Sequence, residues 1–112
     1  MDNKLLTGKN VIVQGITGSQ GSFHTRAMVA AGTNIVAGTS PNKAGQEFEG
    51  IPVYGTIGDI QKDMHVDATV IFVPAAFAKN AVMEAISADI PLIVCITEGV
   101  PIHDMLYIKQ QI

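Results

Sequence analysis

Charged residues are scarce in this sequence of 112 residues. Aspartate, glutamate, lysine and arginine make up 15% of the chain, against about 25% in an average soluble domain. The basic residues form no stripe and the net charge is −3, so we expect no nucleic-acid partner. With an apolar share of 47%, such a composition favours a fold with little outer surface, as a parallel sheet covered on both faces provides.

Cysteine and long apolar runs are also lacking. Cys95 is the only cysteine, which excludes an internal disulfide and a cysteine-based zinc site and is compatible with a reducing cytoplasm. The acidic residues show no metal-ligand spacing, so we expect no metal. No stretch reaches the roughly 18–20 apolar residues of a membrane span, and the first strand follows Met1 too closely to leave room for a leader. We therefore expect a cytoplasmic protein without a membrane partner.

Short apolar runs alternate with helical patterns along the chain. The predicted strands are Asn10–Gln14, Asn34–Gly38, Gly50–Tyr54, Ala68–Val73 and Pro91–Ile96. The predicted helices run from Ser19 or Gln20 to Ala31, over Ile57–Asp63 and Ala75–Ala88, and onward from Pro101. This alternation predicts an α/β fold over residues 1–112, a single Rossmann-like domain with a doubly wound parallel sheet of about five strands in the order 3-2-1-4-5. Because a helical pattern still runs at Ile112, we expect the domain to be part of a longer protein.

Helical spacing also indicates which side chains pack inward. The predicted apolar face of the first long helix consists of Phe23, Ala27, Ala30 and Ala31, with Met28 alongside. In the second long helix, the residues at helical spacing are Phe77, Ala81, Val82, Ala85 and Ile86. Phe77 and Met83 are expected to pack on the helix face. Cys95 lies inside an apolar strand and is expected to be a small core residue.

The first predicted strand is followed by Gly15, Gly18 and Gly21 and then by a helix. A helix N-terminus presents unpaired N–H groups and a positive dipole end, so this arrangement favours an anion site. We expect Gly15 to allow the sharp turn, Gly18 the close approach of a phosphate, and Gly21 close helix–strand packing. The hydroxyls of Thr17 and Ser19 are further candidate donors. The spacing differs from the dinucleotide pattern G-x-G-x-x-G, and the alternative is that these glycines serve turn and packing alone.

The end of the second strand helps to separate the candidate ligands. Domains that bind NAD usually carry an acid about 20 residues past the loop, which holds the ribose 2′-hydroxyl. Here Ala37–Ser40 contains no acid, and the next charged residue is Lys43. A lysine suits a phosphorylated ribose, as in coenzyme A (CoA) or NADP, better than a free ribose diol. The alternative is that Lys43 is a solvated loop residue.

Four stretches are specific when taken together, namely Gln14–His24, Pro41–Gly45, Val73–Phe77 and Ile96–Pro101. Their order and spacing resemble the N-terminal CoA-binding domain of succinate–CoA ligase (succinyl-CoA synthetase) alpha subunits over nearly the whole chain. The CoA contacts that the resemblance implies are Thr17, Gly18, Ser19 and Gln20 at the phosphates, Lys43 at the nucleotide end, and Val73, Pro74, Ile96, Thr97 and Glu98 along the pantetheine path.

The same resemblance implies a role for the parent protein. Succinate–CoA ligases, enzymes of the tricarboxylic acid cycle, form succinyl-CoA from succinate, CoA and a nucleoside triphosphate through a phosphohistidine. The motif of that histidine lies beyond residue 112 in this family, and His24, His65 and His103 do not match it, so we predict no catalytic residue. The implied partner is the beta subunit, which holds the nucleotide and its magnesium. The domain alone is expected to bind CoA and to be inactive.

Two other functions stay open on the sequence. The glycine loop and Lys43 also suit an NADP-binding oxidoreductase domain, and a stand-alone CoA-binding regulatory module would need no catalytic part. The residues that touch the acyl substrate lie elsewhere in the family, as does the choice between ATP and GTP. Relative affinity for CoA, dephospho-CoA and NADP separates a CoA-binding domain from an oxidoreductase domain.

Overall fold

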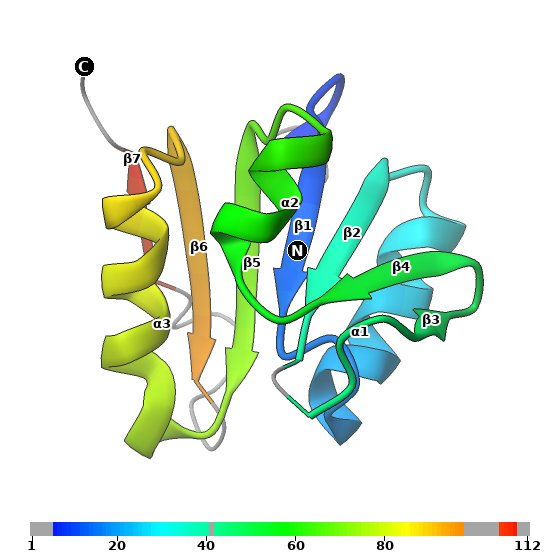
Figure 1. Ribbon diagram of the computed structural model, residues 1–112, viewed down its shortest axis with the longest axis horizontal. Helices are drawn as coiled ribbons and strands as arrows, with labels where there is room; N and C mark the ends of the chain where they lie inside the picture. The colour runs from blue at the N-terminus through cyan, green and yellow to red at the C-terminus, as the bar shows by residue number, and fades with distance from the viewer. Residues whose placement is uncertain (1–5, 41, 98–105, 110–112) are drawn as a thin grey trace.

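A seven-stranded sheet forms the centre of the molecule (Figure 1). The computed structural model describes residues 6–40, 42–97 and 106–109. Within this part of the chain, the strands are β1 (Val11–Gln14), β2 (Ile35–Thr39), β3 (Glu47–Phe48), β4 (Ile51–Tyr54), β5 (Ala68–Val73), β6 (Leu92–Thr97) and β7 (Leu106–Lys109). The helices are α1 (Ser19–Ala30), α2 (Ile57–Asp63) and α3 (Ala75–Ser87).

The strand order is β3-β4-β2-β1-β5-β6-β7. Its five central strands are parallel to one another, and their order confirms the predicted 3-2-1-4-5. An antiparallel strand is added at each edge, β3 beside β4 and β7 beside β6. The Rossmann-like prediction is therefore confirmed, and the sheet is wider than expected.

Strand β7 corrects the helix that was predicted from Pro101. Residues 98–105 lie outside the described part of the chain, but Leu106–Lys109 pair with Leu92–Cys95 of β6 in antiparallel register. The segment is rich in aliphatic and aromatic residues, which suit strands. The outer edge of β6 also offers backbone N–H and C=O groups that a neighbouring strand can pair.

Helices cover both faces of the sheet, as a doubly wound fold requires. In Figure 1, α2 and α3 lie in front of the sheet and α1 lies behind it. Two clusters of buried apolar side chains follow this division, one including Met28 of α1 and the other Ile57 and Ile60 of α2 with Ala85 of α3. Among the described helices, none has the length and apolar character to cross a bilayer.

The buried face of α1 differs from the predicted one. Its buried residues are Gly21, Thr25 and Met28, whereas Phe23 is 64% exposed. The predicted alanines of this face are exposed as well, namely Ala27, Ala30 and Ala31. The face is set by close contact at Gly21, whose lack of a side chain lets α1 approach the loop after β1.

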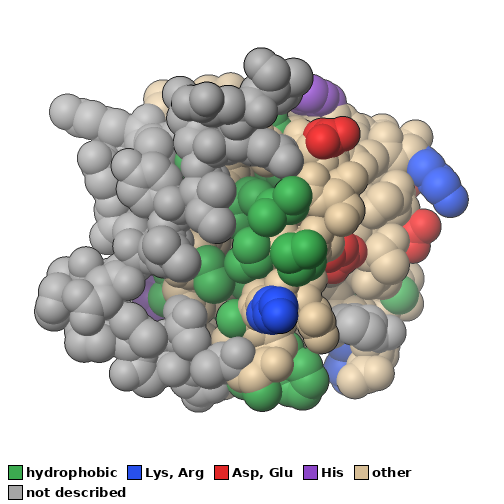
Figure 2. All heavy atoms as spheres, turned by 90° about the vertical axis from the view of Figure 1, so that its left-hand side faces the viewer, with side chains coloured by type: hydrophobic (Ala, Val, Ile, Leu, Met, Phe, Trp, Pro, Cys, Tyr) green, Lys and Arg blue, Asp and Glu red, His purple; other side chains and the backbone are tan. Residues whose placement is uncertain are grey.

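Helix α3 also exposes residues that were expected to pack. Phe77 is 60% and Met83 is 52% exposed, so those two expectations were wrong. The other residues at helical spacing do pack on the sheet, as predicted, and Ala78 joins them; they are Ala81, Val82, Ala85 and Ile86. Figure 2 shows hydrophobic side chains gathered on the side of the molecule that carries α3. Cys95 is buried in the core, as predicted.

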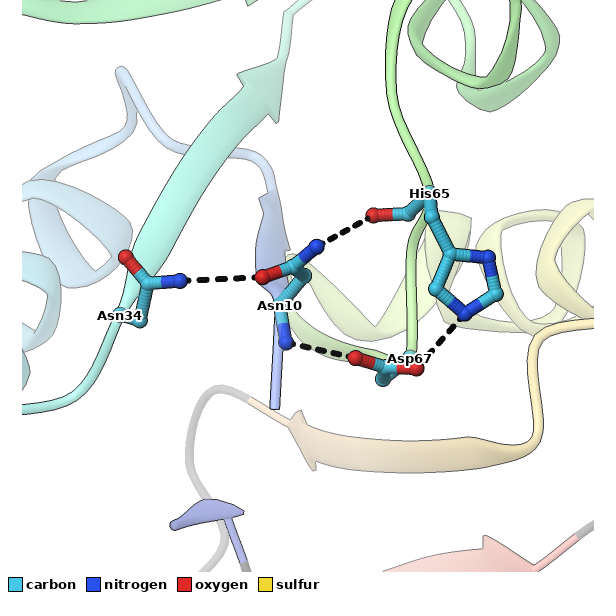
Figure 3. A network of polar contacts seen from close by, with 4 residues as sticks. All are labelled: Asn10, Asn34, His65 and Asp67. Atoms are coloured by element: carbon cyan, nitrogen blue, oxygen red, sulfur yellow. Dashed lines mark hydrogen bonds and ion pairs between the residues drawn. The ribbon is translucent and has the colours of Figure 1, made fainter. Parts of the chain in front are cut away.

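A polar network joins the starts of three strands at the edge opposite the glycine loop (Figure 3). The Asn10 backbone N–H donates to the Asp67 carboxylate at 2.8 Å, and the Asn10 amide donates to the His65 carbonyl at 3.0 Å. The Asn34 amide donates to Asn10 Oδ1 at 3.0 Å. The His65 ring lies 2.8 Å from the second Asp67 oxygen. The network holds β1 in register with its two neighbours.

The surroundings of the Asp67 carboxylate predict that the domain loses stability at acid pH. The hydrogen bond from the Asn10 N–H is the main cause that holds the pKa of Asp67 below its ordinary value. Partial burial raises this pKa, and the His65 side chain lowers it further. A carboxyl group with a lowered folded-state pKa stabilises the fold above its ordinary pKa and loses that contribution as the pH falls through the folded-state pKa. We expect Asp67→Asn, which keeps an acceptor oxygen but does not ionise, to lower the free energy of unfolding by about 1 kcal/mol at pH 7.

Urea unfolding between pH 7 and pH 2.5 measures this effect. The difference between the wild-type chain and Asp67→Asn should disappear at the acid end of the range. The matched control is Glu47→Gln, which removes an exposed carboxylate from β3. If the difference between Asp67→Asn and the wild-type chain did not change with pH, the loss of stability at acid pH would not come from this carboxylate.

Candidate functional site

The carboxyl ends of β1, β2, β5 and β6 meet at one edge of the sheet, the lower edge in Figure 1. The chain leaves β1 through α1 towards β2 on one side, whereas β5 continues through α3 to β6 on the other. The direction of winding therefore reverses between β1 and β5. Open α/β sheets bind ligands in the crevice outside the strand ends at such a reversal point. The glycine loop follows β1, and Val73 and Pro74 follow at the end of β5, so both border this crevice.

Gly15 and Gly21 are required by packing inside the chain. Gly15 has φ +86°, and a Cβ placed there would lie 2.2 Å from the Phe72 carbonyl oxygen. A Cβ at Gly21 would lie 2.0 Å from the Gly15 carbonyl oxygen. Any side chain at either position would collide with backbone. The predicted roles of these glycines, a sharp turn and close helix packing, are thus met by the structure.

Gly18 is different, because nothing in the described part of the chain requires a glycine there. Its backbone has φ −70° and ψ 163°, an extended conformation that any residue adopts. Among the described residues, the nearest atom to a Cβ at this position is the Gly15 carbonyl oxygen at 3.4 Å, an ordinary contact distance. The space beside Gly18 is therefore open to a group that approaches the loop from outside.

The first turn of α1 supplies hydrogen-bond donors to that space. Gly18 is the N-cap and provides no side chain, and no acidic residue lies in the first turn. The N–H groups of Ser19, Gln20 and Gly21 lie in the first turn, where no preceding turn of the helix offers a carbonyl, and no side chain caps them. The first intrahelical bonds run from Ser22 to the Gly18 carbonyl, 2.8 Å from the backbone nitrogen and 2.6 Å from the hydroxyl. Free amides and the helix dipole make this corner attractive to an anion.

The loop is fastened to the end of β2. The Gly15 and Ile16 N–H groups both donate to the Thr39 carbonyl, at 3.0 and 3.3 Å. The Thr17 hydroxyl donates to Ser40 Oγ at 2.8 Å. Thr17 was predicted as a phosphate contact on its own, and the structure shows it joined to a second hydroxyl. Ser40 was not predicted as a site residue, although its place at the end of the second strand is a signal that could have identified it.

The other predicted contacts gather at the same edge. A Cβ at Gly15 would lie 3.0 Å from Val73 Cγ1, which places Val73 directly against the loop. Pro74 is exposed and is the N-cap of α3. The β5–β6 register sets Phe72 opposite Ile96 and Val73 opposite Thr97, so the backbone of the β6 end lies beside Val73. Predicted residue Glu98 lies outside the described part of the chain.

Lys43 is exposed in the turn that follows β2. Its backbone N–H donates to the Ser40 carbonyl at 3.0 Å, and its carbonyl accepts from the Gln46 N–H at 3.1 Å. The turn thus starts at the residue that is bonded to Thr17. Among the predicted contacts, Lys43 is the only one that belongs to this turn.

A buried polar contact supports the strand from which the loop emerges. Gln14, the last residue of β1, is buried and donates from Nε2 to the Ala81 carbonyl of α3 at 3.1 Å. Its Oε1 accepts from the Thr69 hydroxyl of β5 at 2.8 Å. Sequence reasoning placed Gln14 at the end of a strand and at the start of the stretch Gln14–His24, but a glutamine in an apolar run does not by itself reveal its partner.

The histidines in the described part of the chain have structural surroundings. The His24 ring stacks on Phe72 with ring centroids 4.9 Å apart, and Phe23 meets it edge-on. His65 pairs with Asp67 at the opposite edge of the sheet. His103 lies outside the described residues. Within those residues, no three side chains of the metal-ligating types lie together.

Comparison with proteins of known sequence gives close relatives. The chain is 56% identical over 96 residues to succinate–CoA ligase [ADP-forming] subunit alpha 2 of Archaeoglobus fulgidus, covering 86% of this chain and 33% of the relative. It is 50% identical over 99 residues to the corresponding alpha subunit of Aquifex aeolicus, covering 88% and 32%. It is also 48% identical over 101 residues to an ADP-forming sulfoacetate-CoA ligase subunit of an Acholeplasma species, covering 90% and 34%. The chain thus spans about a third of these relatives.

Comparison with solved structures identifies the fold. A Rex-family repressor superposes with a TM-score of 0.69 at 18% identity, covering 89% of this chain and 53% of the repressor. At that identity the likeness concerns the fold alone. The family comparison is more specific, because residues 7–99 match the family described as CoA binding domain. This match includes the glycine loop, the turn that contains Lys43 and the ends of β5 and β6, and the chain belongs to the CoA binding domain family.

Proposed function

We propose that this chain binds CoA at the glycine loop and is the CoA-binding part of the alpha subunit of an ADP-forming succinate–CoA ligase. The observation that carries the proposal is Gly18, a glycine that its described neighbours do not require, next to three helix amides without intrahelical partners. A diphosphate suits this corner, because its oxygens accept hydrogen bonds from such amides. The membership of the CoA binding domain family and the named relatives support the same ligand.

In this proposal the residues divide along the ligand. Thr17, Gly18, Ser19 and Gln20 bind the diphosphate, and Lys43 binds at the nucleotide end. The pantetheine arm passes along the strand ends, bordered by Val73, Pro74, Ile96, Thr97 and Glu98. None of these groups performs a chemical step. Activation of the acid belongs to a phosphohistidine and a nucleotide site outside this chain, the latter on a beta subunit, in a cytoplasmic enzyme of the tricarboxylic acid cycle.

Isothermal titration of the 112-residue chain tests the ligand. We expect CoA to bind more tightly than dephospho-CoA, and both to bind more tightly than NADPH. A preference for NADPH would favour an oxidoreductase domain and overturn the proposal. The acid is tested separately with the full ligase that contains this chain. Release of ADP should depend on succinate, and dependence on sulfoacetate instead would overturn the choice of acid.

Lys43→Ala is expected to weaken CoA binding by a factor of about 2 to 5. The lysine is exposed, and an exposed ion pair contributes only about 0.2–1 kcal/mol. The loss should shrink between 20 and 300 mM NaCl, because salt screens a solvent-exposed pair. Lys62→Ala is the matched control, since Lys62 is an exposed lysine at the end of α2. Equal losses from both variants would contradict a specific contact at Lys43.

A further inference from the structure

We propose that Ser40, oriented by Thr17, is the residue that selects a phosphorylated ribose over an unphosphorylated one. This inference rests on the proposed function, because it concerns how the same site recognises the nucleotide end of CoA. It adds a specificity-determining hydroxyl that the sequence motifs did not indicate. It also gives Thr17 a positioning role in addition to its place in the loop.

The backbone of Ser40 is held on both sides. Its N–H donates to the Tyr54 carbonyl of β4 at 3.0 Å, and its carbonyl accepts from the Lys43 N–H at 3.0 Å. The residue is only 8% exposed. Ser40 is therefore fixed in place at the rim of the sheet, between the glycine loop and the turn that contains Lys43.

The two hydroxyls have more hydrogens than their mutual bond uses. Thr17 Oγ1 and Ser40 Oγ form a hydrogen bond of 2.8 Å. A hydroxyl carries one donor hydrogen and two acceptor lone pairs. Whichever hydroxyl donates in this bond, the pair keeps one hydrogen for another acceptor, and Ser40 Oγ has no other hydrogen bond among the described residues. The pair thus presents one oriented donor at the carboxyl end of β2.

This is the place where related folds read the ribose. In the dinucleotide-binding arrangement, an acid at the end of the second strand accepts hydrogen bonds from ribose hydroxyls. A carboxylate there would repel a phosphate on the ribose, whereas a hydroxyl donor attracts one. Ser40 replaces the acid with such a donor, and Lys43 follows three residues later in the same turn. A hydroxyl and an ammonium group together suit a dianionic phosphate ester.

Three probes and five variants, of which Lys62→Ala is the control, test the inference on the 112-residue chain. The probes are CoA, dephospho-CoA and adenosine 3′,5′-bisphosphate, each titrated by calorimetry. Ser40→Ala should weaken CoA and the bisphosphate about tenfold, as for one hydrogen bond to a charged group, while dephospho-CoA changes less than about twofold. Ser40→Asp should lower the ratio of CoA to dephospho-CoA affinity further, by repulsion. Lys62→Ala, which changes the net charge by the same amount as Ser40→Asp, should leave the ratio unchanged.

The positioning role of Thr17 is tested by Thr17→Val and Thr17→Ser. Valine removes the hydroxyl and should lower the affinity ratio, whereas serine retains the hydroxyl and should restore it. If the Ser40 variants weaken CoA and dephospho-CoA equally, or change only the melting temperature, Ser40 does not read the ribose phosphate and the inference fails. If the wild-type chain binds no CoA at all, the proposed function fails instead.

Discussion

Gly18→Val is expected to abolish CoA binding while the chain stays folded. The backbone at Gly18 is extended, and within residues 6–40, 42–97 and 106–109 a Cβ there meets only the Gly15 carbonyl, at an ordinary distance. The valine methyl groups would therefore occupy the space outside the loop, between the ligand and the amides of the first turn of α1. Each hydrogen bond to a charged group contributes about 1.5–3 kcal/mol, so the loss of two lowers affinity by at least about a hundredfold.

Calorimetric titration with CoA and a thermal melt of the same sample check this result together. The variant should melt close to the wild-type temperature and show no saturable heat of binding. Lys43→Ala is the companion variant, because it removes an exposed charge at the same site and should cost far less. If the two variants lost the same amount of affinity, the phosphate site would have been placed in the wrong part of the loop.

Gly21→Ala is expected to lower the free energy of unfolding by about 3 kcal/mol. A Cβ at this position would lie 2.0 Å from the Gly15 carbonyl oxygen, which is backbone and cannot rotate away. Helix α1 would have to move outward from the sheet, as overpacked cores do at a cost of about 1–3 kcal/mol or more. The same movement would displace the loop, so CoA affinity should fall as well.

Gly58→Ala provides the matched control in another helix. Gly58 lies in α2, and its nearest neighbour to an added Cβ is the Thr56 hydroxyl at 3.8 Å. An alanine in a helix is favoured over glycine by about 0.5–1 kcal/mol. Urea unfolding should thus show opposite signs for the two substitutions. A stabilised Gly21→Ala variant would contradict the close contact between α1 and the loop.

The order of the central strands could be predicted from the sequence because parallel strands are buried on both faces. Such strands appear as uninterrupted apolar runs, and Ala68–Val73 was predicted with the bounds that the structure has. Right-handed crossovers then leave few arrangements for five alternating units. The start of α1 at Ser19 was likewise indicated by the glycine turn.

The aromatic residues of α1 and α3 could not be placed correctly by the same route. Phe23 is the largest apolar residue of α1 and was placed inward, yet contact at Gly21 turns the opposite residues to the sheet. Hydrophobic spacing carries no information about where a missing side chain allows the closest approach. In α3, Phe77 is likewise exposed, while Ala81, Ala85 and their aliphatic neighbours make the contact with the sheet.

Pairings between distant residues were the other missing part. Strand β7 forms by pairing with β6. No local sequence pattern of either segment indicates this pairing. Ser40 belongs to the candidate site through Thr17, which is 23 residues earlier in the sequence. Local motifs identified the glycine loop because all of its donors are neighbours in the chain, whereas a hydroxyl supplied by the next strand requires the fold.

The buried Gln14 has a consequence for the energetics of binding. Its two hydrogen bonds, to Ala81 and Thr69, fix the strand end immediately before Gly15, and the Thr39 carbonyl fixes the two amides after it. The loop therefore has its shape before any ligand arrives. Ordering a flexible segment subtracts conformational entropy from affinity, and a rigid loop avoids that subtraction. Amide exchange at Gly15 and Ile16 should accordingly be slow in the free chain and change little when the site is filled.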